Sequence, residues 1–211
     1  MAHSTLSGVT MQLRQFSRFQ GNEYQESTIT NLAEFTSCVI TKMDKYIQTD
    51  AIYLDLAKAF DSVNVTLLIQ KLNIMGLNEQ LLKWIESYLN GRQQIVKLND
   101  VMSNSINVTS GTGQGYPIGA TLFILFIIDL PHHTLESILQ SFADDTRLWK
   151  HIENFEDCQE LQNDLNKIVK YFRDNRLKLN IKKSNCISYH RGQLQYEFEY
   201  TIDNEKINRV K

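Results

Sequence analysis

The sequence predicts an α+β fold, in which a split β-α-β sheet carries helices on one face. Two observations lead to this prediction. Long stretches repeat apolar residues at three- and four-residue steps, and short apolar runs bounded by turn residues alternate with them. The chain has 211 residues, 42% of them hydrophobic and 22% charged, so it is long enough and apolar enough for a well-buried core.

The first half of the chain predicts a helix, a strand and two further helices. Residues 1–26 show no clear period, and a helical period begins at Ser27 and continues to Ile47. Residues 51–56 form a short apolar run that ends next to an acidic residue, as a buried strand does. Two amphipathic helices are then expected, over residues 65–75 and 79–89.

The middle of the chain predicts a hairpin, a glycine-rich loop and an apolar helix. Residues 93–98 and 105–109 can pair across Asn99 and Asp100. Residues 110–119 hold four of the nine glycines, which indicates that backbone there turns sharply or approaches another group closely. The loop lacks the third glycine of a dinucleotide fingerprint and the Gly-Lys-Ser or Gly-Lys-Thr of a phosphate loop, so both are excluded. Residues 120–130 predict the helix.

The last third predicts a second hairpin, a long helix and a strand-rich end. Two strands are expected on either side of a tight turn at Asp144 and Asp145. A long amphipathic helix and a basic connector follow. The expected ranges are residues 137–142 and 146–150 for the strands, 155–176 for the helix, 177–183 for the connector, and 185–190, 196–202 and 206–210 for the final strands.

Composition narrows the class of protein. The longest apolar run, residues 122–128, is far shorter than the roughly 20 residues that span a bilayer, so no membrane segment is expected. No secretory signal is visible, and three scattered cysteines favour neither a disulfide framework nor a zinc site. We therefore expect an intracellular protein of the cytoplasm or nucleus, with its thiols in the core.

The charge distribution is uneven. The net charge is −2, but residues 167–211 carry 11 Lys and Arg against 5 Asp and Glu, whereas residues 1–166 carry 11 against 19. A basic last quarter is compatible with a phosphate-bearing partner. A solvated basic surface explains the same counts without any partner, so both interpretations stay open.

Acidic residues end two of the expected strands. Asp144 and Asp145 are adjacent, and repulsion between two carboxylates raises the pKa of one of them unless a cation lies beside them. Asp-Asp in a hairpin is by itself ordinary turn chemistry. Asp55 changes the balance, because it ends another buried strand, and Asp61, Ser62 and Asn64 are better placed to cap the helix that follows. Carboxylates that meet at strand ends indicate a metal site.

Five segments in order resemble the reverse transcriptase domain of non-LTR (LINE-type) retrotransposons, and jockey-like elements in particular. Residues 53–63 are similar to motif A, residues 110–123 to motif B and residues 142–145 to motif C. Residues 177–184 are similar to motif D, and residues 200–210 resemble the segment that family members use to reach the primer end.

The resemblance implies a polymerase palm with a ferredoxin-like sheet. It implies a partial fingers region at residues 1–50 and a palm at residues 51–211. Family members carry further fingers segments before this region and a thumb after it, so the resemblance leads us to expect a domain truncated at both ends, without a thumb.

The resemblance also implies an activity and a set of site residues. The activity is RNA-directed DNA polymerisation, with two Mg²⁺ ions as cofactors and an RNA template, a DNA primer and deoxynucleoside triphosphates as partners. The implied metal ligands and catalytic residues are Asp55, Asp144 and Asp145. The implied nucleotide-binding residues are Leu56 through its carbonyl, Phe60 as the residue that selects deoxynucleotides, Gln114, Gly115 and Lys183.

The chain departs from the family pattern in motif B. Gly113, Tyr116 and Ala120 stand where the family has Pro, Ser and Pro, and the loss of two prolines predicts a looser loop. A degenerate palm without catalytic turnover, at most a weak binder of nucleic acid, is therefore a second hypothesis. A two-metal nuclease or phosphatase would leave motifs B and D unexplained, and no His stands beside the aspartates.

Overall fold

The computed structural model describes residues 28–113, 117–133, 136–142, 144–193 and 195–210. The chain divides into two compact units, residues 1–36 and residues 37–211. The described part of the first unit is the beginning of helix α2 (Thr28–Met43), and the sheet lies in the second. The domain boundary expected at residue 50 stays a prediction. None of the helices that the structure describes is long and apolar enough to cross a membrane.

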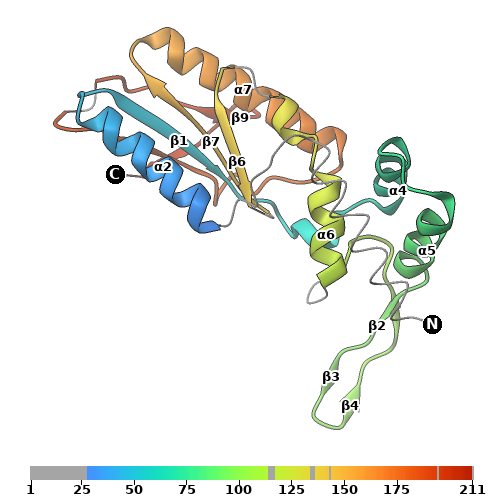
Figure 1. Ribbon diagram of the computed structural model, residues 1–211. Coiled ribbons are helices and arrows are strands. Elements are labelled where there is room, and N and C mark those ends of the chain that lie inside the picture. The colour runs from blue at the N-terminus through green and yellow to red at the C-terminus, as the bar shows by residue number, and fades with distance from the viewer. Residues whose placement is uncertain (1–27, 114–116, 134–135, 143, 194, 211) are drawn as a thin grey trace. The chain divides into compact units, whose positions relative to one another are not determined.

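A five-stranded sheet organises the second unit (Figure 1). Its order is β11-β8-β1-β7-β6, with β11 parallel to β8 and all other neighbours antiparallel. Because β1 is central, it pairs with β7 on one side and with β8 on the other. The bounds are β1 (Gln48–Leu54), β6 (Ile138–Phe142), β7 (Asp145–Ile152), β8 (Asn185–Tyr189) and β11 (Asn208–Val210).

Strand β1 begins three residues before the expected strand. Gln48, Thr49 and Asp50 are polar, and for that reason they fell outside the apolar run, yet all three are wholly buried. Each pairs with a residue of β7. The expected strand also reached Leu56, whereas β1 ends at Leu54 and Leu56 makes an isolated bridge to Leu179.

The helices expected between β1 and the first hairpin are present. A short helix, α3 (Ala59–Ser62), precedes α4 (Val65–Ile74) and α5 (Glu79–Leu89). Asn64 caps α4, because its side chain accepts a hydrogen bond from the backbone N–H of Leu67 at 2.9 Å. The apolar helix α6 (Pro117–Phe126) starts and ends earlier than expected. Pro117 takes the first helical position, where a missing N–H costs nothing, and a 3₁₀ turn, η1 (Leu130–His133), follows.

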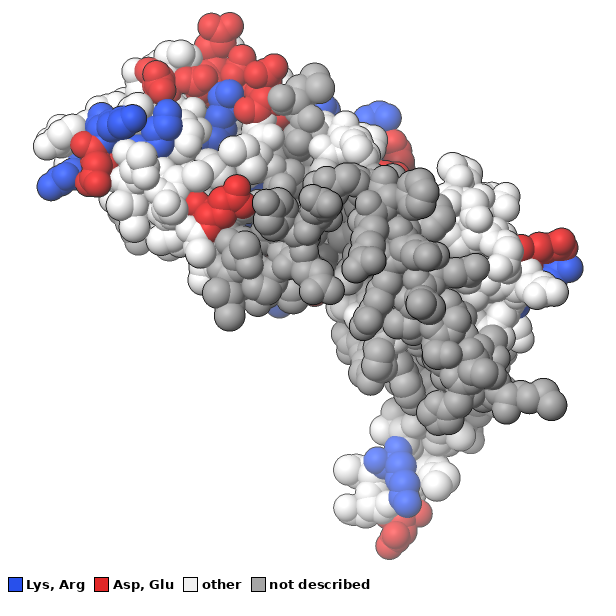
Figure 2. Space-filling view, in the orientation of Figure 1, with Lys and Arg blue, Asp and Glu red and all other residues white. Residues whose placement is uncertain are grey.

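The first hairpin forms in two short ladders. β2 (Gln93–Gln94) pairs with β5 (Ile106–Asn107), and β3 (Lys97–Leu98) pairs with β4 (Val101–Met102) around Asn99 and Asp100, as expected. The hairpin is exposed and mostly uncharged, with one basic and one acidic group near its tip (Figure 2). Its apolar side chains that are more than half exposed are Ile95, Val96, Leu98, Val101, Met102 and Ile106.

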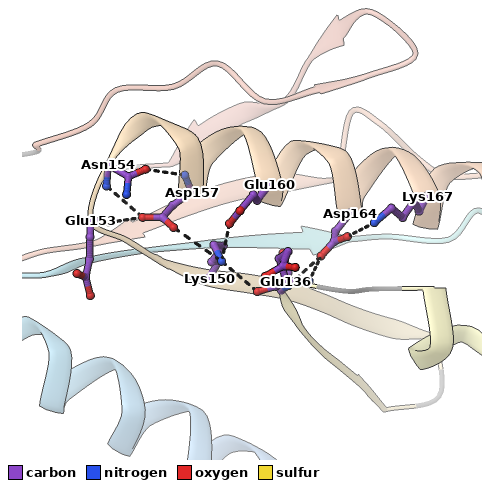
Figure 3. Close-up of polar contacts among 9 residues, drawn as sticks. Glu136, Lys150, Glu153, Asn154, Asp157, Glu160, Asp164 and Lys167 are labelled. Carbon is purple, nitrogen blue, oxygen red and sulfur yellow. Dashed lines mark hydrogen bonds and ion pairs between the residues drawn. The ribbon is translucent and has the colours of Figure 1, made fainter.

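Helix α7 (Phe155–Asp174) covers one face of the sheet and is fixed to it by polar contacts (Figure 3). Asn154 and Asp157 form a capping box at its start. Lys150 of β7 pairs with Glu160 at 2.9 Å, and the buried Asp164 accepts hydrogen bonds from the backbone N–H groups that precede β6. In Figure 2 acidic side chains gather over the start of α7 with basic side chains beside them.

The long strand expected over residues 196–202 is mostly absent, and this prediction is wrong. Only β9 (Thr201–Ile202) forms, paired with β10 (Glu205–Lys206), and β11 is separate. Side-chain amides take the place of a neighbouring strand. Gln162 of α7 both donates to the carbonyl and accepts from the N–H of Thr201, and Gln48 does the same for Tyr196.

A buried carboxylate joins this C-terminal segment to the centre of the sheet. Asp50 is fully buried and accepts hydrogen bonds from Ser188 at 2.6 Å and from the Tyr200 hydroxyl at 2.8 Å. Gln48 and Arg209 complete its set of donors, at 2.9 Å and 3.4 Å. Burial, followed by the nearby charge of Asp50, raises the pKa of Tyr200, so its hydroxyl stays a donor.

A second polar cluster joins helices α4, α6 and α7. The ammonium of Lys71 donates to Asp129 at 2.8 Å and to the Phe126 carbonyl at 2.8 Å, and the Tyr171 hydroxyl donates to Asp129 at 2.6 Å. Burial lowers the pKa of Lys71 more than Asp129 raises it. Burial alone would raise the pKa of Asp129, but the hydrogen bonds from Lys71 and Tyr171 and the Lys71 charge outweigh it and hold that pKa below 3.8.

The glycine-rich loop is docked on the segment that follows β1. The N–H of Gly111 donates to the Val63 carbonyl at 2.8 Å, and Gly111 has a φ of +89°. A methyl group added there would lie 2.8 Å from the Cα of Asp61. At Gly119, in the first turn of α6, it would lie 2.1 Å from the carbonyl oxygen of Gly113. Both glycines are therefore required by close backbone contact.

Replacement of Lys71 by Met tests the cluster between the helices. Met keeps most of the apolar stem and removes the charge, so we expect a loss of about 1 to 2 kcal/mol in the free energy of unfolding at pH 7, modest because Asp129 is 44% exposed. The stability from a carboxylate with a lowered pKa is present above its unfolded pKa and is lost as the pH falls through the folded one. The difference between wild type and variant in urea unfolding should therefore shrink below pH 3.8. A difference that grows in acid would contradict this assignment.

Replacement of Gly111 by Ala tests the docking of the glycine loop. Both the positive φ and the 2.8 Å backbone contact oppose a methyl group, so we expect destabilisation of about 2 to 4 kcal/mol in thermal or urea unfolding. Gly76→Ala is the matched control, because Gly76 also has a positive φ but open space around it. That variant should lose only about 1 kcal/mol. Equal losses would mean that backbone conformation alone, and not contact, requires Gly111.

Candidate active site

Asp55 follows directly after β1, and a separate turn holds its backbone. The carbonyl of Asp55 accepts a hydrogen bond from the N–H of Asn180 at 2.7 Å, and its N–H donates to the Ser184 hydroxyl at 3.2 Å. One residue further, the Leu56–Leu179 bridge continues the contact. The side chain of Asp55 is half-buried. The end of β1 is therefore fixed in place while its carboxylate keeps access to solvent.

Asp144 and Asp145 lie at the connection of β6 and β7, as expected from the sequence. Phe142 of β6 pairs with Asp145, the first residue of β7, and Asp144 lies in the turn between the two strands. Ala143 lies outside the described residues. In the β1–β7 register Leu54 pairs with Thr146. Asp55 and Asp145 therefore occupy the next position on the two strands, at the same end of the sheet. We call this end, defined by Asp55, Asp144 and Asp145, the carboxylate end.

The donor chemistry at the carboxylate end suits a hard divalent cation. Asp144 is half-buried, Asp145 is exposed, and both offer carboxylate oxygens. Among the residues that the structure describes, no group of three or more His, Cys, Asp or Glu side chains gathers closely enough to hold a metal ion by itself. Mg²⁺ needs less than this, because one or two carboxylates with phosphate and water complete its shell. Asp55 and Asp145 offer two carboxylates at the same end of the sheet.

Phe60 and Leu56 lie within a few residues of Asp55. Phe60 is in α3 and half-buried, with its ring centroid 4.8 Å from that of the buried Phe123 in α6. Its carbonyl accepts a hydrogen bond from the N–H of Thr112 in the glycine loop. The ring of Phe60 is thus supported on one side by the core, while part of it remains exposed. Leu56 is buried.

Two of the expected nucleotide-binding residues, Gln114 and Gly115, lie outside the described residues, as does Tyr116. The described segments on both sides of them lie close together. Gly113 precedes them and its carbonyl lies against Gly119, so that α6 starts close to the point where the described loop ends. The predictions for Gln114 and Gly115 stay predictions.

Lys183 lies in the same turn that holds Asp55. Its N–H donates to the Asn180 carbonyl at 3.0 Å, and Asn180 in turn binds the Asp55 carbonyl. The side chain of Lys183 is exposed. Two segments far apart in the sequence, those of motifs A and D, are thus joined at the carboxylate end.

Aromatic and basic side chains from three strands contact one another on the sheet, starting at Tyr53, two residues before Asp55. Tyr53 of β1 shares a 2.9 Å hydrogen bond with the Tyr189 hydroxyl of β8. Arg147 of β7 lies 5.8 Å from the ring centroid of Tyr53 and donates to Gln140 of β6. Burial, and then the hydrogen bond with Tyr53, raises the pKa of Tyr189. The Tyr189 hydroxyl therefore stays protonated and acts as a neutral hydrogen-bonding group.

Two kinds of residue were not recognised from the sequence: those that hold the backbone of Asp55, and the buried carboxylate of Asp50 in strand β1. Asn180 and Ser184 belong to the motif D segment, but nothing in their spacing indicates that they bind the backbone of Asp55. Asp50 carried a signal that could have been used, because an acidic residue directly before an apolar strand is either a turn residue or a buried, fully paired one. The structure shows the second.

Comparison with known proteins places these motifs in a family. The model of the family described as "Reverse transcriptase (RNA-dependent DNA polymerase)" matches residues 5–202. The probable RNA-directed DNA polymerase from transposon X-element of Drosophila melanogaster is 30% identical over 122 residues, 56% of this chain. The RNA-directed DNA polymerase from mobile element jockey of Drosophila funebris is 27% identical over 140 residues, 63% of this chain. These relatives confirm the resemblance to jockey-like elements.

The solved structures that resemble the chain confirm the fold. Telomerase of Candida tropicalis, in complex with a fragment of telomeric RNA, matches 97% of this chain with a TM-score of 0.65 and 13% identity. Telomerase of Candida albicans matches 96% with a TM-score of 0.65 and 12% identity. The α+β palm predicted from the sequence is therefore present. The chain spans 13% and 15% of the two Drosophila relatives and 36% of each telomerase chain. Because the family model covers most of its length, the chain belongs to the reverse transcriptase (RNA-dependent DNA polymerase) family.

Proposed function

We propose that this chain is the palm of an RNA-directed DNA polymerase, which transfers nucleotides from deoxynucleoside triphosphates to the 3′-hydroxyl of a DNA primer on an RNA template. The observation that carries the proposal is the strand register, in which Leu54 of β1 pairs with Thr146 of β7, so that Asp55 and Asp145, the next residue outward on each side, lie at the same end of the sheet. Family membership supplies the reaction class. In the same proposal residues 51–211 are the palm and residues 1–50 are part of the fingers.

Divalent metal ions are the general cofactors of this family, and Mg²⁺ suits the carboxylate end. Bound there, two such ions would supply the positive charge that lowers the pKa of the primer hydroxyl and offsets the charge of the triphosphate. Asp55, Asp144 and Asp145 are the residues that would hold them. The hydrogen bonds of Asn180 and Ser184 to the backbone of Asp55 would keep its carboxylate in a fixed position while substrates exchange.

The remaining site residues would bind and select the nucleotide. The ring of Phe60, supported by Phe123, would occupy the space that a 2′-hydroxyl needs. Gln114 and Gly115 would lie along the nucleotide and template. Lys183 is exposed in the turn that contacts Asp55, and its ammonium would pair with the leaving pyrophosphate or donate a proton to it. The Leu56 carbonyl would add one further oxygen.

Removal of the carboxylates tests the proposed reaction. The 211-residue chain should extend a DNA primer on an RNA template when Mg²⁺ and deoxynucleotides are present, and the double variant Asp144→Asn, Asp145→Asn should lower the rate by at least about 10³-fold, because developing charge is no longer offset. Asp55→Asn should have a similar effect.

The control for these variants is Asp100→Asn, which removes one carboxylate from the exposed hairpin turn between β3 and β4. It should leave extension unchanged. If wild type and the double variant extend the primer equally, or if neither extends it, the polymerase proposal is wrong for this chain and the hypothesis of a palm without turnover takes its place.

Phe60→Val tests nucleotide selection. A smaller side chain opens the space beside the sugar, so we expect the preference for deoxynucleotides over ribonucleotides to fall by roughly ten- to a hundred-fold in kcat/KM. Phe60→Tyr keeps the ring and should keep most of the preference. If Phe60→Val lowers use of both nucleotides equally, the ring serves packing against Phe123 and does not select the sugar.

A further inference from the structure

Some basic side chains of the described residues form ion pairs and others do not, and the two groups lie in different places. In the last quarter, Lys167, Lys170 and Arg173 pair with acidic residues within or near α7. Arg191, Lys206 and Arg209 are paired as well. Within the part of the chain that the structure describes, the basic side chains with neither an ion pair nor a side-chain hydrogen bond are Lys45, Lys58, Lys97, Arg176, Lys178, Lys182 and Lys183.

Most of these unpaired cations lie on two segments that contact each other at the carboxylate end. The N–H of Ala57, next to Lys58, donates to the carbonyl of Lys178 at 2.8 Å. Lys182 lies in the turn between Asn180 and Ser184, both of which bind the backbone of Asp55. We call the group Lys58, Arg176, Lys178 and Lys182 the connector patch. All four side chains are exposed.

The cations of the connector patch outnumber the acidic groups beside it that have no other partner. Asp55 and Asp61 stand three residues on either side of Lys58, and the other two nearby carboxylates are paired elsewhere. Asp174, two residues before Arg176, pairs with Lys170 at 3.1 Å, and Asp203 pairs with Arg173. Among the described residues outside this region, Lys45 and Lys97 are also unpaired, but they lie apart from each other in the sequence, whereas the unpaired cations here lie on two segments in contact. Four unmatched positive charges on backbone that hydrogen bonds tie together form a surface suited to a string of phosphates.

We propose that the connector patch binds the phosphodiester backbone of the nucleic acid whose end is presented to the carboxylates. This inference rests on the proposed function, because it takes the carboxylate end as the place of the reaction. It goes further in assigning the hold on nucleic acid to Lys58, Arg176, Lys178 and Lys182, none of which has a role in the chemical step. The contacts are electrostatic and carry no sequence preference.

Salt dependence of binding tests this proposal without requiring turnover. Binding of the 211-residue chain to a labelled RNA–DNA hybrid is measured by fluorescence anisotropy from about 50 to 300 mM salt, without Mg²⁺ or nucleotides. The slope of log K against log salt is negative. In the triple variant Arg176→Gln, Lys178→Gln, Lys182→Gln, we expect it to become shallower by about 2 to 3, since each lost phosphate contact removes roughly 0.9 from its magnitude. Affinity at low salt should fall with it. Thermal unfolding should be unchanged, because the side chains are exposed.

The matched control is Lys45→Gln, Lys83→Gln, Lys97→Gln, which removes the same number of charges from exposed positions outside the connector patch. It should keep the wild-type slope. Equal losses in both triple variants would show that net charge alone governs binding and would overturn the proposal, as would a wild-type chain that binds no hybrid. Primer extension separates the two hypotheses. If the triple variant lowers the salt slope but the wild-type chain extends no primer, the connector patch is supported and the polymerase proposal is rejected. If the wild-type chain extends the primer but the triple variant keeps the wild-type slope, the polymerase proposal is supported and the connector patch is rejected.

Discussion

The structure depends on the pairing of β1 along both of its edges. One register with β7 and one with β8 fix which residues of β1 face α7 and which strand ends meet. A slip by one residue would move Asp50, Ile52 and Leu54 to the opposite face of the sheet. The same slip would separate Asp55 from Asp145. The packing of the core and the assembly of the carboxylate end are therefore set by a single alignment.

Asp50 makes that alignment specific. Apolar residues such as Ile52 and Leu54 tolerate several neighbours, but a fully buried carboxylate requires donors at defined positions. Ser188 of β8 and Arg209 of β11 supply them only in the observed register, and Tyr200 supplies another from outside the sheet. An alternative pairing would leave a buried charge without donors, at a cost of several kcal/mol. The polar centre of the sheet thus acts against wrong registers more than it adds stability.

The sequence predicts the helices and turns, which depend on local pattern. It does not predict segments whose backbone hydrogen bonds go to side chains instead of to a neighbouring strand. The helices, the hairpin turn at Asn99 and the turn at Asp144 follow from periodicity and turn chemistry, and motif order placed Asp55 beside them. The start of β1 was missed because Gln48 and Asp50 are polar but buried. Residues 196–202 alternate like a strand, yet Tyr196 bonds to the side chain of Gln48, 148 positions away, and Thr201 bonds to the side chain of Gln162, 39 positions away. No local pattern contains such contacts.

The burial of two cysteines allows the separation of helix α7 from the sheet to be measured by thiol alkylation. Cys158 and Cys186 are both buried, and burial raises the pKa of each thiol, that of Cys186 to about 12. Since the thiolate is the reactive form, a maleimide or iodoacetamide reagent reaches these sulfurs only when α7 separates from the sheet. Cys38 is partly exposed and reacts without such a change. The ratio of slow to fast alkylation thus measures how often α7 leaves the sheet, independently of any activity.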